Sequence, residues 1–224
     1  MKTRTLKELI LYGYRYWVGY GIVVGFIIYF LGWKLGTLTN GVSAAELTIA
    51  AKNSSLSSIL QNPAAPLHSL LQWISIRFLG VEVLDLRIPT ALLSLVVAFF
   101  LYQLMRKWFG KPTALLSTAI FISADWFLFV ARYGTGGIEF SLWLSLALLC
   151  FTKLIERNYK WLVLYAVSLI GLLLTPFGIY AALTLTISLF VGKVFRERLH
   201  ESSLLYKVPA FLLVLAGLSF AAYT

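Results

Sequence analysis

Long apolar runs separated by short polar segments dominate the hydrophobicity pattern of this chain. An apolar run of about 20 residues is long enough for a helix to cross a hydrocarbon core of roughly 30 Å. We predict seven such spans, with only one long connection, which lies between the first two. The predicted spans are 16–33, 88–105, 112–130, 139–154, 161–174, 178–191 and 208–224, and the long loop is 34–87. The pattern therefore predicts an all-α integral membrane protein in which residues 1–224 form a single transmembrane module.

Prolines and glycines support several of these boundaries. Pro89 and Pro112 fall in the predicted first turns of their spans, where the missing N–H of proline costs nothing. The apolar stretch 161–192 is too long for one comfortable crossing, and Thr175-Pro176-Phe177-Gly178 interrupts it. Because proline and glycine this close together favour a turn, we predict a tight helical hairpin there.

The distribution of Lys and Arg indicates which side of the membrane each connection faces. Of the 19 basic residues, four lie in 1–15, three in 106–111, three in 153–160 and four in 193–207. Cytoplasmic segments carry an excess of basic residues, so these four segments are predicted to be cytoplasmic. The N-terminus is then cytoplasmic, and the long loop 34–87 lies on the outer face.

Composition excludes several classes of function. The chain is 60% hydrophobic and 12% charged, and its net charge of +10 comes without the dense basic clusters that would predict a nucleic-acid partner. Cys150 is the single cysteine, so neither an intramolecular disulfide nor a cysteine-based metal site can form. A transporter or channel would need ionisable groups in several spans. In this chain Asp125 is nearly the only ionisable residue within a predicted span.

Two short helices are predicted inside the long outer loop. Ser43-Ala44-Ala45-Glu46 fits a capping box, which would start a helix that ends near Asn53-Ser54-Ser55. A second helix follows Pro66, with its apolar residues on one stripe and polar residues on another face. The stripe is Leu67, Leu70, Leu71, Ile74 and Phe78, and the polar face is His68, Gln72 and Ser75. Such a helix lies in the membrane interface with its apolar face down, so the two helices would cover a cavity at the outer surface.

The order of these features resembles a known family. A first span and a long outer loop with an early acidic residue are followed by NPAAPLHSLLQ, LRIPTALLSL and ADWFLFVARYGTGG. This order resembles the GT-C superfamily of membrane glycosyltransferases, in particular the bacterial relatives of the dolichyl-phosphate-mannose protein mannosyltransferases and the lipid A aminoarabinose transferases. The resemblance covers residues 16–156.

The resemblance implies a function and a location. The family transfers a sugar from a polyprenyl-phosphate donor to a protein, lipid or glycan acceptor on the outer face of the plasma (inner) membrane, among membrane lipids. It implies that Glu46 is the catalytic base or orients the acceptor. Many relatives carry an Asp-Glu pair there, but Ala45 precedes Glu46 in this chain. No cofactor motif is evident, and a divalent cation is left open. Relatives continue beyond the spans, so the chain is expected to be part of a larger enzyme.

Transfer with polyprenyl phosphate as the leaving group needs a carboxylate for the acceptor proton and positive charge or N–H donors at the phosphate. Arg132 and Arg87 lie near the outer surface, and a guanidinium matches phosphate oxygens in a bidentate manner. The alternatives are that Glu46 is only a helix cap and that Arg87 pairs with Asp85 or Glu82.

Three further residues are candidates for substrate binding. Asp125 lies near the outer end of the third span, where it would bind substrate or pair with Arg132. His68 would contact a phosphate or a sugar hydroxyl, or would be a solvated interfacial histidine. Relatives carry an acidic residue after the arginine of the later loop, where this chain has Gly136-Gly137, so Glu139 is the nearest carboxylate. A non-catalytic membrane scaffold or an inactive family member is the alternative to the enzyme.

Overall fold

A computed structural model describes residues 21–22, 24–29, 31–35, 42–61, 64–156 and 158–198, with side chains as far as residue 188. Every regular element in these residues is helical, so the predicted all-α fold class is confirmed. Residues 21–22, 24–29 and 31–32 are helical. The elements that follow are α2 (Ala44–Lys52), α3 (Leu56–Gln61), α4 (Pro66–Phe78), α5 (Val83–Phe109), α6 (Lys111–Ser123), α7 (Asp125–Arg132), α8 (Ile138–Ile155), η2 (Tyr159–Trp161), α9 (Leu162–Leu173) and α10 (Gly178–Arg198). The predicted span 208–224 lies outside the described residues, as does the start of the span 16–33.

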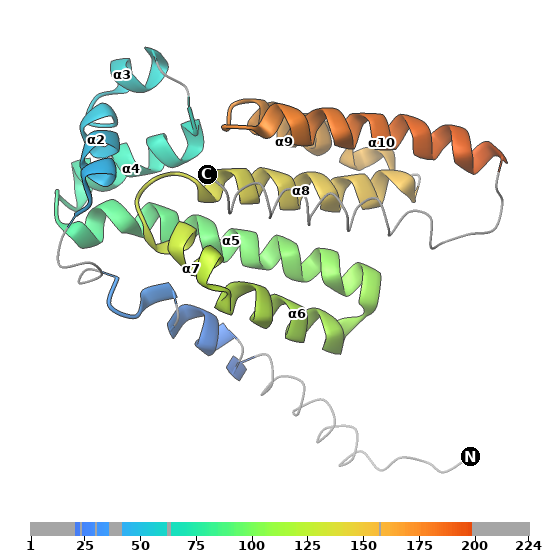
Figure 1. The fold of residues 1–224 in the computed structure, drawn as a ribbon, viewed down its shortest axis with the longest axis horizontal. Helices are drawn as coiled ribbons and strands as arrows, with labels where there is room; N and C mark the ends of the chain where they lie inside the picture. The colour runs from blue at the N-terminus through green and yellow to red at the C-terminus, as the bar shows by residue number, and fades with distance from the viewer. Residues whose placement is uncertain are drawn as a thin grey trace, which may run out of the picture.

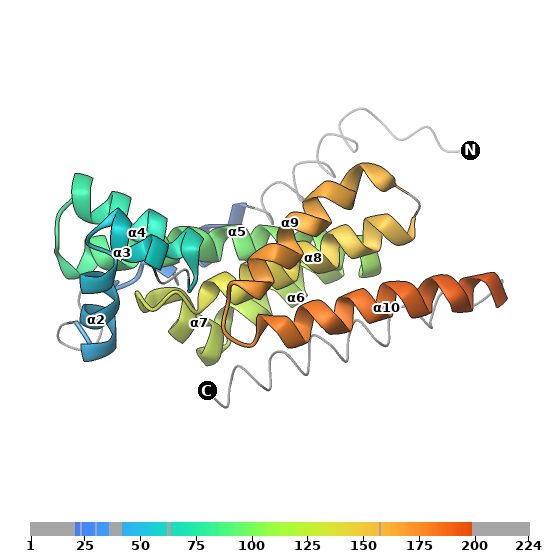
Figure 2. The ribbon, with the colours of Figure 1, turned by 90° about the horizontal axis from the view of Figure 1, so that it is seen from above.

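The long helices lie side by side, and the short helices of the long loop gather at one end of them (Figures 1 and 2). Helix α5 packs against α8 and α6, and α8 also packs against α9. Helices α2, α3 and α4 lie where α5 begins and where α7 connects to α8 (Figure 1). Residues far apart in the sequence therefore meet at this end of the molecule.

Two helices among the described residues, Val83–Phe109 and Ile138–Ile155, are long and apolar enough to cross a membrane. Helices α6 and α7 would together form a third span if the break between them is counted as part of one crossing, and shorter apolar helices cover Tyr159–Leu173 and Gly178–Ser188. The chain is therefore a helical membrane protein. The full set of seven spans, and their sidedness, remain predictions.

Helix α5 begins at Val83 rather than at residue 88, so Pro89 lies inside the helix and not in its first turn. The earlier start follows from Glu82, whose backbone N–H donates to Asp85 Oδ2 at 3.2 Å. A proline inside a helix leaves the carbonyl four residues earlier without its partner. Here that carbonyl belongs to Asp85, and it accepts a hydrogen bond of 2.6 Å from Ser75 Oγ of α4. The proline therefore creates an acceptor that helps to attach α4 to α5.

The predicted third span is broken. Helices α6 and α7 meet at Ala124, whose backbone is extended (ψ 133°), and their axes differ by 67°. Asp125 is the first residue of α7, where a negative charge is favourable because the helix N-terminus carries partial positive charge. Asp125 is therefore exposed at a break between helices rather than enclosed in a continuous span.

The turn predicted at Thr175–Gly178 is present, and the chain reverses between α9 and α10. A Cβ at Gly178 would lie 1.7 Å from the carbonyl oxygen of Leu172, so only glycine fits this turn. Helix α9 also approaches α8 closely, because a Cβ at Gly171 would lie 2.2 Å from the indole of Trp143. This contact becomes important for the position of α4.

Candidate functional site

Glu46 is positioned by the predicted capping box, which the structure confirms. The Glu46 backbone N–H donates to Ser43 Oγ at 3.2 Å, and the Ser43 backbone N–H donates to Glu46 Oε2 at 2.9 Å. Helix α2 ends at Lys52 with Asn53 as its C-terminal cap. The first turn of α2 thus holds the Glu46 carboxylate in one orientation, toward α5.

Glu46 forms a buried ion pair with Arg87. Arg87 Nε donates to Glu46 Oε1 at 2.8 Å and Arg87 Nη2 donates to Oε2 at 2.9 Å, which is a bidentate arrangement. Arg87 Nη1 donates to the carbonyl of Leu35 at 2.9 Å, and the Gly134 backbone N–H donates to Glu46 Oε1 at 2.9 Å. Both charged side chains are 0% exposed. The partner of Arg87 is therefore Glu46, and neither Asp85 nor Glu82.

The charge state of Glu46 follows from these contacts. Burial by itself would raise the pKa of this carboxyl group. The hydrogen bonds from Arg87, Gly134 and Ser43, together with the positive charge of Arg87, outweigh burial and lower the pKa to about 2. The carboxylate is therefore ionised at neutral pH and binds a proton weakly.

The connection from α7 to α8 approaches Glu46 as bare backbone. A Cβ at Gly134 would lie 2.9 Å from the carbonyl oxygen of Leu86, 3.5 Å from Gln72 Nε2 and 3.6 Å from Glu46 Oε1. Gln72 Nε2 donates to that same Leu86 carbonyl at 3.3 Å. Asn53 Nδ2 donates to Gln72 Oε1 at 2.6 Å, so the amide group of Gln72 links α2, α4 and α5.

His68 and Glu139 meet at a second buried polar contact. The His68 backbone N–H donates to Glu139 Oε2 at 2.8 Å, and the His68 ring nitrogen Nε2 is 3.0 Å from Thr90 Oγ1. Burial lowers the pKa of His68 to about 4, so the ring is neutral at neutral pH. The imidazole lies against Gly136, where a Cβ would be 3.1 Å from Nδ1. His68 is therefore a buried residue and not a solvated interfacial histidine.

The face of α4 that packs into the protein is the polar one. Its buried residues are His68, Ser69, Gln72 and Ser75. On the opposite side, Leu70, Ile74 and Phe78 are 41%, 38% and 78% exposed. Leu67 and Leu71 of the predicted apolar stripe pack against a buried hydrophobic cluster, whereas Leu70, Ile74 and Phe78 face away from the protein. Burial of these three side chains in the membrane interface remains a prediction.

Arg132 and Asp125 lie at the two ends of α7 and form no ion pair with each other. Arg132 Nη2 donates to the carbonyl of Trp33. The buried Nε–H of Arg132 has no hydrogen-bond partner among the described residues. Arg132 thus lies at the end of α7, two residues before Gly134, and its Nε–H remains available as a donor.

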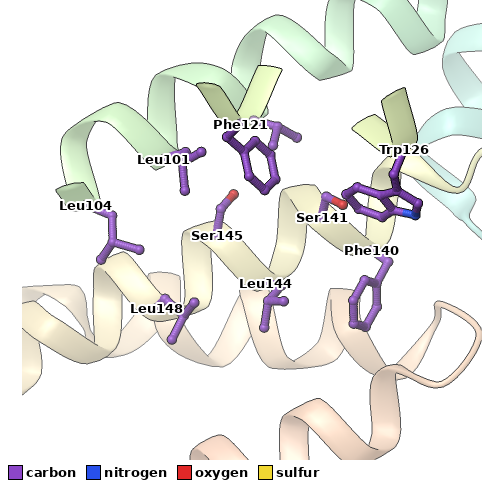
Figure 3. A pocket seen from close by; sticks show the side chains of 10 residues that line it. Leu101, Leu104, Phe121, Trp126, Phe140, Ser141, Leu144, Ser145 and Leu148 are labelled. Carbon is purple, nitrogen blue, oxygen red and sulfur yellow. The ribbon is translucent and has the colours of Figure 1, made fainter. Parts of the chain in front are cut away.

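A small groove lies elsewhere in the described part of the chain, between α5, α8 and the α6–α7 pair (Figure 3). Its volume is about 40 Å³, and Leu101, Phe121, Trp126 and Leu144 are among the residues that line it. None of its lining side chains is an acid, a base or a histidine, so the groove has no groups for acid–base chemistry. No group of three or more His, Cys, Asp and Glu side chains in the described residues could hold a metal ion.

The structure divides the six predicted site residues into groups. Glu46 and Arg87 are bonded to each other, His68 and Glu139 are bonded to each other, and Arg132 and Asp125 stand apart. Sequence reasoning missed the Gly134 N–H, the Gln72 amide and Trp143. The GTGG sequence at residues 134–137 was the available signal for the first, because glycines allow close approach of the backbone.

One comparison with known proteins gives a match. A family model described as dolichyl-phosphate-mannose-protein mannosyltransferase matches residues 62–222, which is more than half of the chain. Searches of curated proteins and of solved structures gave no match. The matched region contains Arg87, Arg132 and Glu139 and begins after Glu46.

Proposed function

The chain belongs to the dolichyl-phosphate-mannose-protein mannosyltransferase family of GT-C-type membrane glycosyltransferases, and we propose that it moves a sugar from a polyprenyl-phosphate donor to an acceptor on the outer face of the plasma membrane. In this reaction an acceptor oxygen bonds to C1 of the sugar while the bond from C1 to the phosphate oxygen breaks. The polyprenyl phosphate departs with the electron pair, and the acceptor proton passes to a carboxylate or to water.

The observation that supports this proposal is the ionised Glu46 bonded to Arg87, with Arg132 close enough to Arg87 to feel its charge. Arg87 bonds Glu46 directly, and Arg132 comes two residues before Gly134, which also bonds Glu46. A carboxylate and two guanidinium groups are the groups that proton transfer and phosphate departure require. We assign the acceptor to Glu46 and the phosphate to Arg132 and Arg87.

The geometry favours an orienting role for Glu46 over that of a proton acceptor. A general base works best when its pKa lies near the working pH, and the pKa of Glu46 is about 2. Glu46 is also 0% exposed while Arg87 covers it. In the proposed reaction Arg87 moves from the carboxylate to the donor phosphate, which uncovers Glu46 for the acceptor. The free Nε–H of Arg132 supplies a second phosphate contact.

The same contacts favour a second candidate, an inactive family member that serves as a membrane scaffold. Four N–H donors already occupy the carboxylate of Glu46, and Ala45 stands where many relatives carry an aspartate. A buried ion pair of this kind needs no substrate to satisfy it. In this reading Glu46 and Arg87 only hold the outer loop to α5.

Turnover by Glu46 variants distinguishes the two candidates. We expect Glu46→Gln to abolish consumption of a polyprenyl-phosphate-linked sugar in membranes while the protein still accumulates. Glu156→Gln is the matched control, because Glu156 is an exposed acid that pairs with Lys107 at the opposite end of α8. Unchanged turnover in Glu46→Gln would refute the catalytic assignment. If the wild type consumes no donor and polyprenyl phosphate does not raise its melting temperature, the scaffold is the correct reading.

A further inference from the structure

Helix α4 begins without a cap of its own. Ala65 occupies the capping position with a left-handed backbone (φ 51°) and has no side chain that could accept a hydrogen bond. The first N–H groups of a helix have no partner within the helix. Pro66 has no N–H, and the Ser69 N–H donates to the carbonyl of Ala65 at 3.0 Å. The N–H groups of Leu67 and His68 are the two that need an acceptor.

Glu139 of α8 supplies that acceptor. The Leu67 N–H donates to Glu139 Oε1 at 3.2 Å, and the His68 N–H donates to Oε2 at 2.8 Å. Trp143 Nε1, one turn further along α8, donates to Oε1 at 2.9 Å. Glu139 is 0% exposed and has no ion pair with any described Lys or Arg. The three N–H donors therefore satisfy both oxygens of this buried carboxyl group.

This cap links α4 to the hairpin of α9 and α10. Trp143 reaches Glu139 while its indole lies against Gly171, where a Cβ would be 2.2 Å away. The Ala65 N–H donates to the carbonyl of Leu174 at the end of α9. The start of α4 is thus attached to α8 and to the end of α9.

Helix α4 also contacts the residues around Glu46. One turn beyond His68, Gln72 accepts a hydrogen bond from Asn53, the residue that ends α2. Gln72 Nε2 lies beside Gly134, whose N–H bonds Glu46. A shift of α4 along its axis would therefore move the Gln72 amide relative to Gly134 and Asn53.

We propose that Glu139 is a positioning residue, which caps α4 from α8 and thereby keeps Gln72, Gly134 and the Glu46–Arg87 pair in register. Glu139 is close in sequence to the residues that it links, since it follows Gly134 by five positions and precedes Trp143 by one helical turn. The effect on sugar transfer rests on the function proposed above, whereas the effect on structure does not.

Hydrogen exchange of the full chain in detergent or nanodiscs tests the structural part. In Glu139→Leu we expect exchange of the 67–69 amides to rise by roughly tenfold, because a lost cap leaves buried N–H groups unsatisfied. We also expect faster exchange at Gly134 and in residues 43–52. Glu139→Gln, which keeps one acceptor oxygen, should restore much of the protection. Glu156→Gln, at the other end of α8, should leave both regions unchanged.

Two results would overturn the proposal. One is unchanged exchange at residues 67–69 in Glu139→Leu, and the other is faster exchange there without any change at Gly134 and in 43–52. If Glu139→Leu does not fold, Trp143→Phe removes one donor to the carboxylate and should produce a smaller rise in the same two regions. An unchanged pattern in Trp143→Phe would then count against the proposal. Donor turnover is measured separately, so a protein with the expected exchange pattern and no activity refutes only the proposed function.

Discussion

The buried ion pair gives the sharpest prediction. Arg87→Met removes the guanidinium from a carboxylate that has no exposed surface. Breaking a buried pair by removing one partner costs about 3–5 kcal/mol, because the remaining charge is left uncompensated. At roughly 2–4 °C per kcal/mol for a domain of this size, the melting temperature should fall by about 6–20 °C.

The same substitution should reverse the pH dependence that this site contributes. In the wild type the pKa of Glu46 is lowered from 4.5 to about 2, so the site contributes about 3 kcal/mol that is lost as the pH falls through this range. In Arg87→Met burial is opposed only by the N–H groups of Gly134 and Ser43, and we expect the pKa to rise above its ordinary value. A group whose pKa is raised by folding contributes stability at low pH and loses it as the pH rises.

Thermal unfolding followed by tryptophan fluorescence between pH 2 and pH 8 measures both effects, because the wild-type loss occurs below pH 4.5. Glu46→Gln/Arg87→Met removes both charges and keeps an acceptor for Gly134, so it should be more stable at neutral pH than Arg87→Met, with no pH dependence from this site. Lys107→Met is the control, because its pair with Glu156 is 38% and 41% exposed and such pairs contribute up to about 1 kcal/mol. An Arg87→Met melting temperature equal to that of Lys107→Met would refute the reasoning.

Three further predictions concern neighbouring contacts. Ser75→Ala should lower the free energy of unfolding by about 1–3 kcal/mol, because the Asp85 carbonyl loses its donor. Adding Pro89→Ala should recover stability by restoring a backbone N–H, and an equal cost of Ser75→Ala with Pro89 or with Ala at position 89 would contradict this. The pKa of His68 is lowered from 6.5 to about 4, so the wild type should lose about 3 kcal/mol as the pH falls through this range, whereas His68→Gln should show a flat profile there. Gly171→Ala should cost about 1–3 kcal/mol in melting experiments because its Cβ meets the Trp143 indole, whereas Gly25→Ala, with nothing within 4 Å, should cost nothing.

Local features of this fold could be predicted from the sequence. The capping box of Glu46, the end of α2 at Asn53 and the turn at Thr175–Gly178 each depend on residues within a few positions of one another. Helix type also followed directly, because long apolar runs in a membrane can satisfy their backbone groups only as helices or barrels. Family membership followed from the order of several short segments.

Contacts between distant residues could not be predicted in this way. The partner of Glu46 is 41 residues away, and Asp85 and Glu82 were closer candidates for Arg87. The break at Ala124 is hidden because the hydrophobicity of the segment continues across it. The polar face of α4 reads as solvent-exposed until its partners are known, since its acceptors come from the carbonyls of α5 and the carboxylate of α8.

The cap of α4 has a consequence for how the protein is made. Ribosomes deliver the chain from its N-terminus, so Ser43, Glu46 and His68 emerge well before the groups that complete their contacts. Gly134 follows Glu46 by 88 residues, and Glu139 follows His68 by 71. The loop therefore cannot complete these contacts until the later helices have been synthesised and inserted. During that interval it is accessible to any factor that binds unfolded segments.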